Sequence, residues 1–345
     1  MEKERFIHSL KNYTANIILI WLAILFYRTN KYYIDFLRPD TQTVILYLAL
    51  IYTVVGFFVY IFFPSDLTKR TKGRVLAQSV KRMSREYYRY LKEFTSSSSH
   101  PLPKIDKEEK TAFLFLIVKI FFLPIMLNFM FSNYNGLKGY INILASTDNL
   151  FSVESFINIL YPFAIVIMFF IDTLYFTFGY AVEAKFLGNT VRSVEPTIFG
   201  WIVALACYPP FNGLVSDYVS WYANDSVNFA TSTITVIMRI VIIILFIIYL
   251  GATLSLGAKC SNLTNRGIVS RGTYSWIRHP AYISKVGAWW LMIIPVFSLF
   301  AFVSMALWTG VYFLRAITEE RHLIQDPDYV QYCKKVKWRF IPGIY

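Results

Sequence analysis

The chain alternates long apolar stretches with polar connections. In a window of about 19 residues, the length of a helix that crosses the hydrocarbon layer, this pattern predicts about eight membrane spans. Pro209 and Pro210 interrupt the fifth span, and the last two form a tight hairpin that breaks at Pro295. The prediction is an all-α, polytopic transmembrane helical protein. The spans lie near residues 13–27, 42–63, 111–132, 155–181, 197–215, 231–256, 281–295 and 297–317.

Composition supports a membrane protein. Of 345 residues, 56% are hydrophobic and 16% are charged, which excludes a disordered chain, a collagen-like chain and an ordinary secreted globular domain. The cysteines and the histidines share no metal-ligand spacing, so we expect neither a disulfide framework nor a metal site. These residues are Cys207, Cys260, Cys333, His8, His100, His279 and His322.

The charge distribution predicts an orientation. The net charge is +13, and most of the Lys and Arg residues fall in connections that share a side with both termini. This asymmetry predicts that both termini are cytoplasmic. Because no nucleic-acid-binding module is recognisable, we expect membrane lipids and no nucleic acid as partners. The plasma membrane and the endoplasmic reticulum both remain open as locations, and the sequence does not indicate an oligomeric state.

The first 250 residues carry no chemical motif and are predicted to be a membrane-spanning N-terminal region. They include a basic cytoplasmic segment, 64–110. Within it, residues 72–94 place apolar side chains at helical spacing opposite a row of Lys and Arg. Two interpretations stay open, a basic helix on an anionic inner leaflet and a solvated cytoplasmic helix.

A few charged residues fall within the predicted spans or at their cytoplasmic ends. Lys119, Asp172 and Arg239 lie inside spans, where charge is costly and often functional; the sequence leaves their roles open. For the charges at the inner ends of the fourth and fifth spans, two interpretations stay open: a contribution to a site, and ordinary interfacial charges, which is the preferred one. These charges are Glu183, Lys185, Arg192 and Glu195.

The chemical residues concentrate in the predicted C-terminal region, 251–345. The polar segment 254–285 contains glycines for tight turns, three arginines, and the pair His279-Pro280, which begins the next helix. Such a loop suits an anionic or nucleotide-like ligand, although a basic loop that follows the positive-inside rule would look similar.

A second motif continues the last span. In RAITEERHL, residues 315–323, Arg315 and Glu319 are one helical turn apart, and Glu320 points in a different direction. The pair is either a surface salt bridge or part of a site in which carboxylates bind a cation or ribose hydroxyls. The tail 326–345 predicts a short amphipathic helix and a strap that caps a site at the interface.

The order GTYSWIRHPAY (272–282), helical hairpin, RAITEERHL (315–323), DPDY (326–329) and RFIPG (339–343) resembles a known family. It is similar to the membrane methyltransferases related to isoprenylcysteine carboxyl methyltransferase and to phospholipid N-methyltransferases. The resemblance covers about residues 250–345. It implies S-adenosylmethionine as the cofactor, a lipophilic or lipidated acceptor, and a cofactor-binding region around the C-terminal helical hairpin.

The resemblance also implies roles for individual residues. Arg315 would face the carboxylate of the acceptor and, with Glu319, act in catalysis. The implied cofactor-binding residues are Tyr274, Arg278, His279, Tyr282, Glu319, Glu320, Tyr329 and Arg339. The chemistry of these side chains agrees, because carboxylates bind ribose hydroxyls, a guanidinium binds a carboxylate through two bonds, and aromatic rings pack against adenine or a sulfonium.

The sequence departs from the family pattern at two places. Thr273 stands where the family usually has a proline, and Ser284-Lys285 replaces a small glycine, adding a cation at the inner mouth of the seventh span. Carboxyl O-methylation of an isoprenylcysteine-like acceptor is the preferred prediction. The alternatives are phospholipid N-methylation, an NADPH-dependent sterol or polyprenol reductase, suggested by the ending YCKKVKWRFIPGIY, and a non-enzymatic transporter or scaffold.

Overall fold

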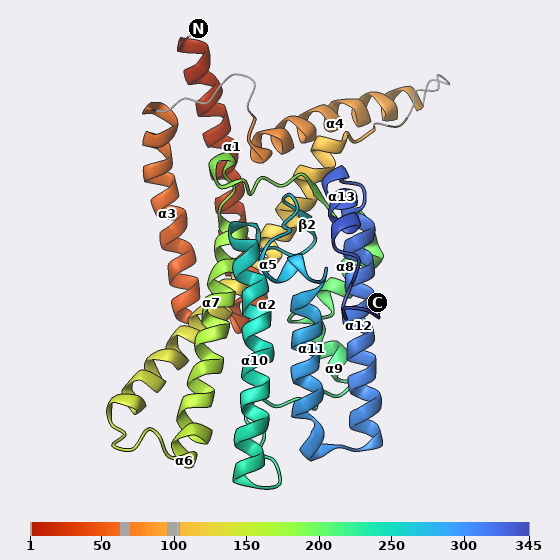
Figure 1. The fold of residues 1–345 in the computed structure, drawn as a ribbon. Helices are drawn as coiled ribbons and strands as arrows, with labels where there is room; N and C mark the ends of the chain where they lie inside the picture. The colour runs from red at the N-terminus through yellow and green to blue at the C-terminus, as the bar shows by residue number, and fades with distance from the viewer. Residues whose placement is uncertain (1, 63–69, 95–101, 103, 345) are drawn as a thin grey trace. The chain divides into compact units, whose positions relative to one another are not determined.

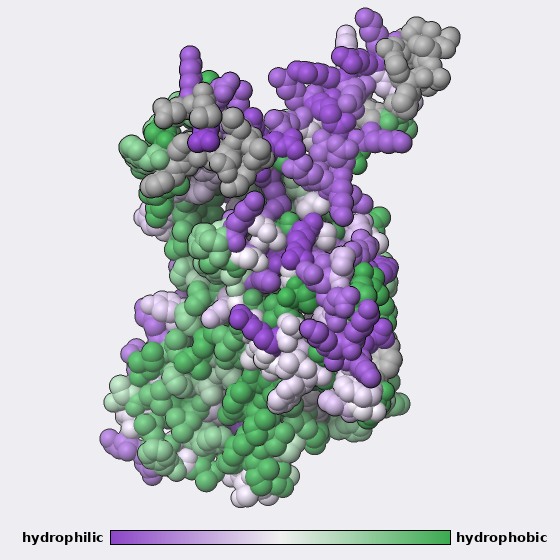
Figure 2. Space-filling model, turned by 45° about the horizontal axis from the view of Figure 1, so that its top comes forward, coloured by the Kyte–Doolittle hydropathy of each residue, from purple (hydrophilic) through white to green (hydrophobic). Residues whose placement is uncertain are grey.

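The structure, a computed structural model, describes residues 2–62, 70–94, 102 and 104–344. Within these ranges the chain is helical apart from loops and one pair of two-residue strands (Figure 1). Six helical segments are long and apolar enough to cross a membrane. On the face seen in Figure 2, hydrophobic and hydrophilic residues gather in separate regions of the surface. The prediction of an all-α polytopic membrane protein is confirmed. The six segments are Lys3–Thr29, Pro39–Phe62, Lys107–Ala145, Val153–Ala181, Ser232–Lys259 and Leu299–Leu323.

The count of six differs from the predicted eight for physical reasons. The predicted span 197–215 consists of two short helices, α8 (Ile198–Leu205) and α9 (Phe211–Ser216), on either side of the two prolines. The predicted span 281–295 is α11 (Pro280–Met292), whose 13 residues extend about 20 Å at 1.5 Å per residue. That length is less than the roughly 30 Å of a hydrocarbon core.

The chain divides into two compact units, 1–124 and 125–345. The N-terminal unit contains α1 (Glu2–Thr29), α2 (Lys31–Phe36), α3 (Pro39–Phe62), α4 (Lys72–Phe94) and the first part of α5 (Lys107–Ala145). Thr53 joins α1 to α3, because its carbonyl accepts a hydrogen bond from the Tyr13 hydroxyl at 2.5 Å and its hydroxyl accepts one from Trp21 Nε1 at 3.1 Å. The basic helix predicted for residues 72–94 is confirmed as α4. The predicted boundary at residue 250, which separates sequence with and without motifs, stays a prediction.

The C-terminal unit is built on long helices packed around an aromatic core. It contains the remainder of α5, then α6 (Val153–Ser155), η1 (Phe156–Leu160), α7 (Tyr161–Ala181), α8, α9, α10 (Ser232–Leu256), α11 and α12 (Leu299–Leu323). Tyr161, Phe246, Met292 and Met305 are completely or almost completely buried in its main hydrophobic cluster. This packing fixes α7, α10, α11 and α12 as a common frame.

Arg239 belongs to this frame. Its guanidinium donates to the carbonyls of Ile157, Ser226 and Val227, and it lies 4.5 Å from the centre of the Tyr161 ring. The side chain is only 3% exposed. Since carbonyl oxygens and an aromatic face surround the cation, its role is to tie the α7 and α10 ends together.

Short elements connect the frame on the side where the motifs lie. They are η2 (Lys185–Leu187), β1 (Ser193–Val194), η3 (Gly257–Lys259), β2 (Thr264–Asn265), η4 (Gly272–Ser275) and α13 (Pro327–Lys335); η5 (Ile294–Val296) joins α11 to α12 at their opposite end. β1 pairs with β2 in antiparallel fashion, with Ser193 opposite Asn265. The predicted hairpin break at Pro295 is η5, and Pro280 is the first residue of α11, as predicted.

Candidate active site

A cavity opens in the C-terminal unit where α10, α11 and α12 meet the connecting loops. It encloses about 1050 Å³ of space that atoms do not fill, measured out to its open mouth. Six predicted site residues line it: Tyr274, Arg278, His279, Tyr282, Arg315 and Glu319. Three predicted residues, Glu320, Tyr329 and Arg339, are not part of its wall.

Arg315 is held in the cavity by aromatic rings. Its guanidinium carbon lies 5.2 Å, 5.3 Å and 5.8 Å from the ring centres of Tyr282, Tyr312 and Tyr208. Its Nη2 donates to Asn262 Oδ1 at 3.0 Å. Arg315 is 7% exposed and forms no ion pair with a carboxylate of the described residues. A guanidinium with donors to spare in a largely dry site is suited to bind an anion through two hydrogen bonds.

Glu319 lies one turn beyond Arg315 on α12. Its Oε2 accepts a hydrogen bond from the Tyr282 hydroxyl at 2.8 Å, and the residue lines the cavity. The alternative of a surface salt bridge between Arg315 and Glu319 is not what the structure has, because each side chain contacts Tyr282 instead. Tyr282 therefore positions both of these side chains, one with its ring and the other with its hydroxyl.

Glu320 points away from the cavity wall and binds three residues of the chain. Its Oε1 lies 3.0 Å from His279 Nε2, and its Oε2 accepts from Arg278 Nη1 at 3.0 Å and from Arg339 Nε at 2.9 Å. Glu320 is 7% exposed. This carboxylate joins α12, the start of α11 and the C-terminal tail, so Glu320 and Arg339 support the cavity from behind.

The tail is fastened to the start of α11 through the backbone. The amide of Arg278 donates to the Trp338 carbonyl and the amide of His279 to the Arg339 carbonyl, both at 2.9 Å. The His279 ring stacks on Tyr282 with centres 5.4 Å apart and planes 6° apart, and Phe340 packs near it. The short helix and strap expected from the tail are thus α13 and the segment that follows it.

Tyr329 supports the cavity indirectly. It is 3% exposed and clusters with Tyr332 and Val336 of the α13 region, against which Tyr274 and Leu323 pack. The Tyr332 hydroxyl donates to the Tyr274 carbonyl at 2.7 Å. Burial raises the pKa of Tyr274 well above its usual value, so its hydroxyl stays protonated at physiological pH.

A loop far from the motifs in sequence braces the end of α12. Arg192 donates to Asp326 Oδ2 at 2.9 Å and to Asp328 Oδ2 at 2.6 Å, and Asn265 Nδ2 donates to Asp326 Oδ2 at 2.7 Å. Burial alone would raise the pKa of Asp326, but the hydrogen bonds from Asn265 and Arg192 hold it below its usual value. Arg192 was expected to be an ordinary interfacial charge, and the structure gives it a bracing role.

The same loop also contributes a wall residue. Glu195 is 2% exposed, lines the cavity, and pairs with Arg321 Nη2 at 3.1 Å. It sits against Gly200, where an added Cβ would lie 2.5 Å from Glu195 Cγ. In the sequence, an ordinary interfacial charge was the favoured interpretation of Glu195; its burial depends on packing against Gly200, which the sequence alone does not indicate.

Lys285 is a second cation in the cavity. Its Nζ lies 5.2 Å from the ring centre of Tyr249 and 5.3 Å from that of Trp289, and it pairs with no carboxylate of the described residues. Nearby, Asp172 accepts hydrogen bonds from the Tyr249 hydroxyl at 2.8 Å and from Thr253 Oγ1 at 2.5 Å. Lys285, which departs from the family pattern in the sequence, therefore lies in the wall of the site itself. Lys119, in the N-terminal unit, lies 5.6 Å from the centre of the Phe115 ring and is no part of this wall.

Residues 231–325 match the model of the isoprenylcysteine carboxyl methyltransferase (ICMT) family. The matched segment covers just over a quarter of the chain and contains α10, the 257–279 loops, α11 and α12. The match confirms the resemblance and supports a membrane methyltransferase. The DPDY and RFIPG elements (326–329 and 339–343) lie beyond the matched residues. No curated protein and no solved structure matches the chain.

Proposed function

We propose that this membrane methyltransferase-like protein transfers a methyl group from S-adenosylmethionine to the carboxylate of a lipophilic acceptor, such as an isoprenylated cysteine. The observation that supports the proposal is the environment of Arg315. A guanidinium enclosed by three tyrosine rings, with one neutral hydrogen-bond partner, sits one helical turn from a carboxylate that faces the same cavity.

The cavity wall has the donors and acceptors that S-adenosylmethionine requires. Glu319 has an oxygen left to accept from ribose hydroxyls or an ammonium group, since among the described residues its one hydrogen bond joins Oε2 to Tyr282. Arg278 and His279 supply positive or donating groups for the amino-acid carboxylate, and Arg278 Nε is a buried donor with no partner among the described residues. Tyr274 supplies an aromatic surface for adenine. The residues present therefore fit the cofactor.

The chain's contribution to the reaction is orientation and exclusion of water. When bound, S-adenosylmethionine supplies an activated methyl group on a sulfonium. Arg315 would hold the acceptor carboxylate by two charge-assisted hydrogen bonds and keep one oxygen directed at that methyl group. Because the acceptor is already an anion, no proton has to be removed and no general base is required. The rings of Tyr208, Tyr282 and Tyr312 keep water from the reacting atoms.

Arg315 and Lys285 favour an acid over an amine as the acceptor. A phospholipid amine is cationic before it loses a proton, and two cations in a cavity of low dielectric oppose its entry. Lys285 would add to the attraction of an anionic head group. By the positive-inside rule, we expect the mouth of the cavity to face the cytoplasm, because the connecting loops around it are rich in basic residues.

Equilibrium binding of S-adenosylmethionine and NADPH to the detergent-purified full chain tests the cofactor, with His279→Ala as the matched variant. We expect S-adenosylmethionine to bind, NADPH not to bind, and the variant to lose affinity. Transfer of a labelled methyl group to N-acetyl-S-farnesylcysteine, compared with phosphatidylethanolamine, then tests the acceptor. Selective NADPH binding would refute the methyltransferase proposal, and methylation of the phospholipid alone would refute the carboxylate acceptor.

A further inference from the structure

Helix α4 of the N-terminal unit has three distinct sides. One side packs on the unit: Val75 and Leu76 are buried against Leu19 of α1 and against Ala112 and Leu116 of α5. A second side is apolar and exposed, and a third is basic and exposed. A helix surrounded by water needs no exposed apolar side, so we expect a partner to cover this side of α4.

The exposed apolar side is a stripe of four side chains, with the exposed Ser84 between the first of them and the other three. Val80, Tyr87 and Leu91 follow one another at intervals of seven and four residues, and Tyr88 adjoins them. Val80, Tyr88 and Leu91 are 64%, 69% and 62% exposed. At 100° per residue, these four side chains fall within a sector of about 100°. The stripe is wide enough to rest on another apolar layer.

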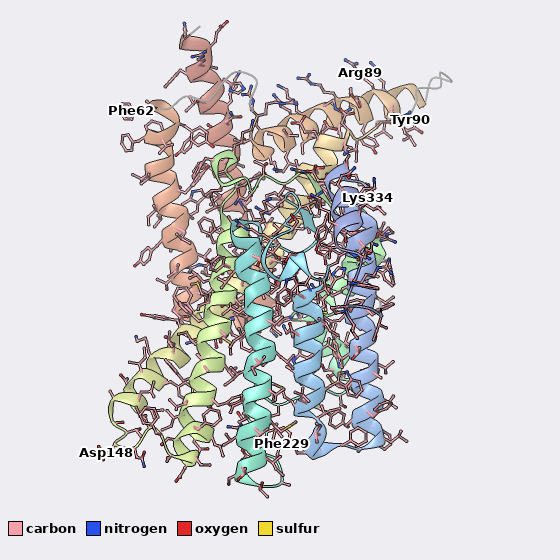
Figure 3. The ribbon with its side chains drawn as sticks, in the orientation of Figure 1. Phe62, Arg89, Tyr90, Asp148, Phe229 and Lys334 are labelled. Carbon is pink, nitrogen blue, oxygen red and sulfur yellow. The ribbon has the colours of Figure 1, made fainter. Side chains whose placement is uncertain are left out.

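The basic side borders this stripe. Lys81, Arg85 and Arg89 are exposed, and none forms an ion pair with a carboxylate of the described residues. Arg82 differs, because it turns toward the unit and pairs with Glu86 at 2.8 Å and Glu109 at 2.5 Å. In Figure 3, Arg89 and Tyr90 mark the far end of α4, and in Figure 2 hydrophilic surface covers this projecting helix. The three unpaired cations therefore face outward together.

The position of α4 along α1 and α5 indicates which layer of the membrane it lies beside. Gly73, at its start, packs against Asn16 and Leu19 of α1, where an apolar span begins at about residue 13. Leu76 and Ala112 meet where the apolar part of α5 begins, at about residue 111. Figure 1 shows α4 running crosswise to α1 and α3. α4 thus leaves the unit at the boundary between the hydrocarbon layer and water.

We propose that α4 docks on the anionic lipid head groups of the membrane in which the chain itself is embedded. The apolar stripe enters the boundary between head groups and acyl chains, and Lys81, Arg85 and Arg89 contact the lipid phosphates or carboxylates. The inference is independent of the proposed methyltransferase activity. The partner is identified by the positive charge of α4 and by its level at the edge of the hydrocarbon layer. Binding of α4 to an acidic protein instead would contradict the proposal.

Hydrogen exchange of the full chain in lipid nanodiscs tests this docking. We expect the peptides of residues 72–94 to be better protected in nanodiscs with 30% phosphatidylserine than in pure phosphatidylcholine. A Lys or Arg near an anionic surface contributes an attraction that corresponds to about a fivefold change in equilibrium. Each cation removed should therefore lower the protection gained from phosphatidylserine by up to about fivefold.

The test variant combines Lys81→Gln, Arg85→Gln and Arg89→Gln. The matched control, Lys334→Gln, Lys335→Gln and Lys337→Gln, removes the same charge from the α13 region. We expect the first variant to lose the dependence on phosphatidylserine and the control to keep it. Equal protection of wild-type α4 in both lipids, or an equal loss in both variants, would overturn the proposal.

Discussion

Arg315 gives the sharpest test, because its replacement should affect stability and turnover in different ways. The side chain is 7% exposed and its cation has no carboxylate partner in the part of the chain that the structure describes. Burying an unpaired cation is costly, and the three tyrosine rings offset only part of that cost. Replacing Arg315 with Gln should therefore leave the thermal stability of the protein unchanged or raise it.

The same replacement should severely damage turnover. In the proposed complex Arg315 donates two charge-assisted hydrogen bonds to the acceptor carboxylate, and a hydrogen bond to a charged group contributes about 1.5–3 kcal/mol. Loss of both, with one weaker bond from the new amide, corresponds to about 3 kcal/mol, or roughly 150-fold in kcat/KM. Arg315→Lys keeps the charge but not the two-pronged geometry, so its loss should be intermediate, about tenfold.

The assay measures kcat/KM for methyl transfer to N-acetyl-S-farnesylcysteine, the dissociation constant of S-adenosylmethionine, and the melting temperature of each variant. Lys334→Gln, on the exposed surface of α13 and labelled in Figure 3, is the control for loss of a charge. We expect the cofactor affinity of Arg315→Gln to stay within about threefold of wild type. A large fall in melting temperature, or equal losses of acceptor turnover and cofactor affinity, would refute the assignment of Arg315 to the acceptor.

Three further predictions concern the other carboxylates and the second cation. Glu319→Gln should raise the dissociation constant of S-adenosylmethionine by about tenfold, because a charged hydrogen-bond acceptor is replaced by a neutral one. Equilibrium dialysis measures this constant, and an unchanged value would exclude Glu319 from the cofactor site. Glu320→Gln should lower the free energy of unfolding by about 3 kcal/mol or more, because it leaves Arg278 and Arg339 partly unpaired. Denaturant unfolding of the purified protein measures this change. A fully stable variant that fails only to bind the cofactor would contradict the supporting role of Glu320. Lys285→Met should increase KM for the anionic acceptor with little change in kcat, and an unchanged KM in steady-state assays would exclude Lys285 from acceptor binding.

Local patterns predicted the elements around the site well. The bounds of α4, the break at Pro295 and the start of α11 at Pro280 follow from short-range signals, namely helical periodicity and the fixed geometry of proline. The difference between the eight predicted spans and the six long apolar helices has the same origin. An apolar run around Pro209 has the composition of a span, but hydropathy does not register that the prolines divide the run into two short helices.

The partners of the site residues could not be predicted, because they come from distant segments. Asn262 and Tyr208, which surround Arg315, precede it by 53 and 107 residues, and only packing of α8, α10 and α12 brings them together. The sequence did predict that Glu319 and Glu320 point in different directions, since neighbours on a helix differ by about 100°. It did not indicate which of them faces the cavity, which depends on where α11 and the tail lie.

The geometry of α12 explains how two ligands would be aligned on a single rigid element. Arg315 and Glu319 differ by four residues, a rise of about 6 Å along the helix, so a group bound at one lies within reach of a group bound at the other. Tyr282 links the two, because its ring contacts the Arg315 guanidinium and its hydroxyl binds the Glu319 carboxylate. Glu320, on the adjoining direction of the same turn, anchors that turn to Arg278, His279 and the tail. In the proposed complex, the spacing between acceptor and cofactor would thus be determined by the backbone of one helical turn.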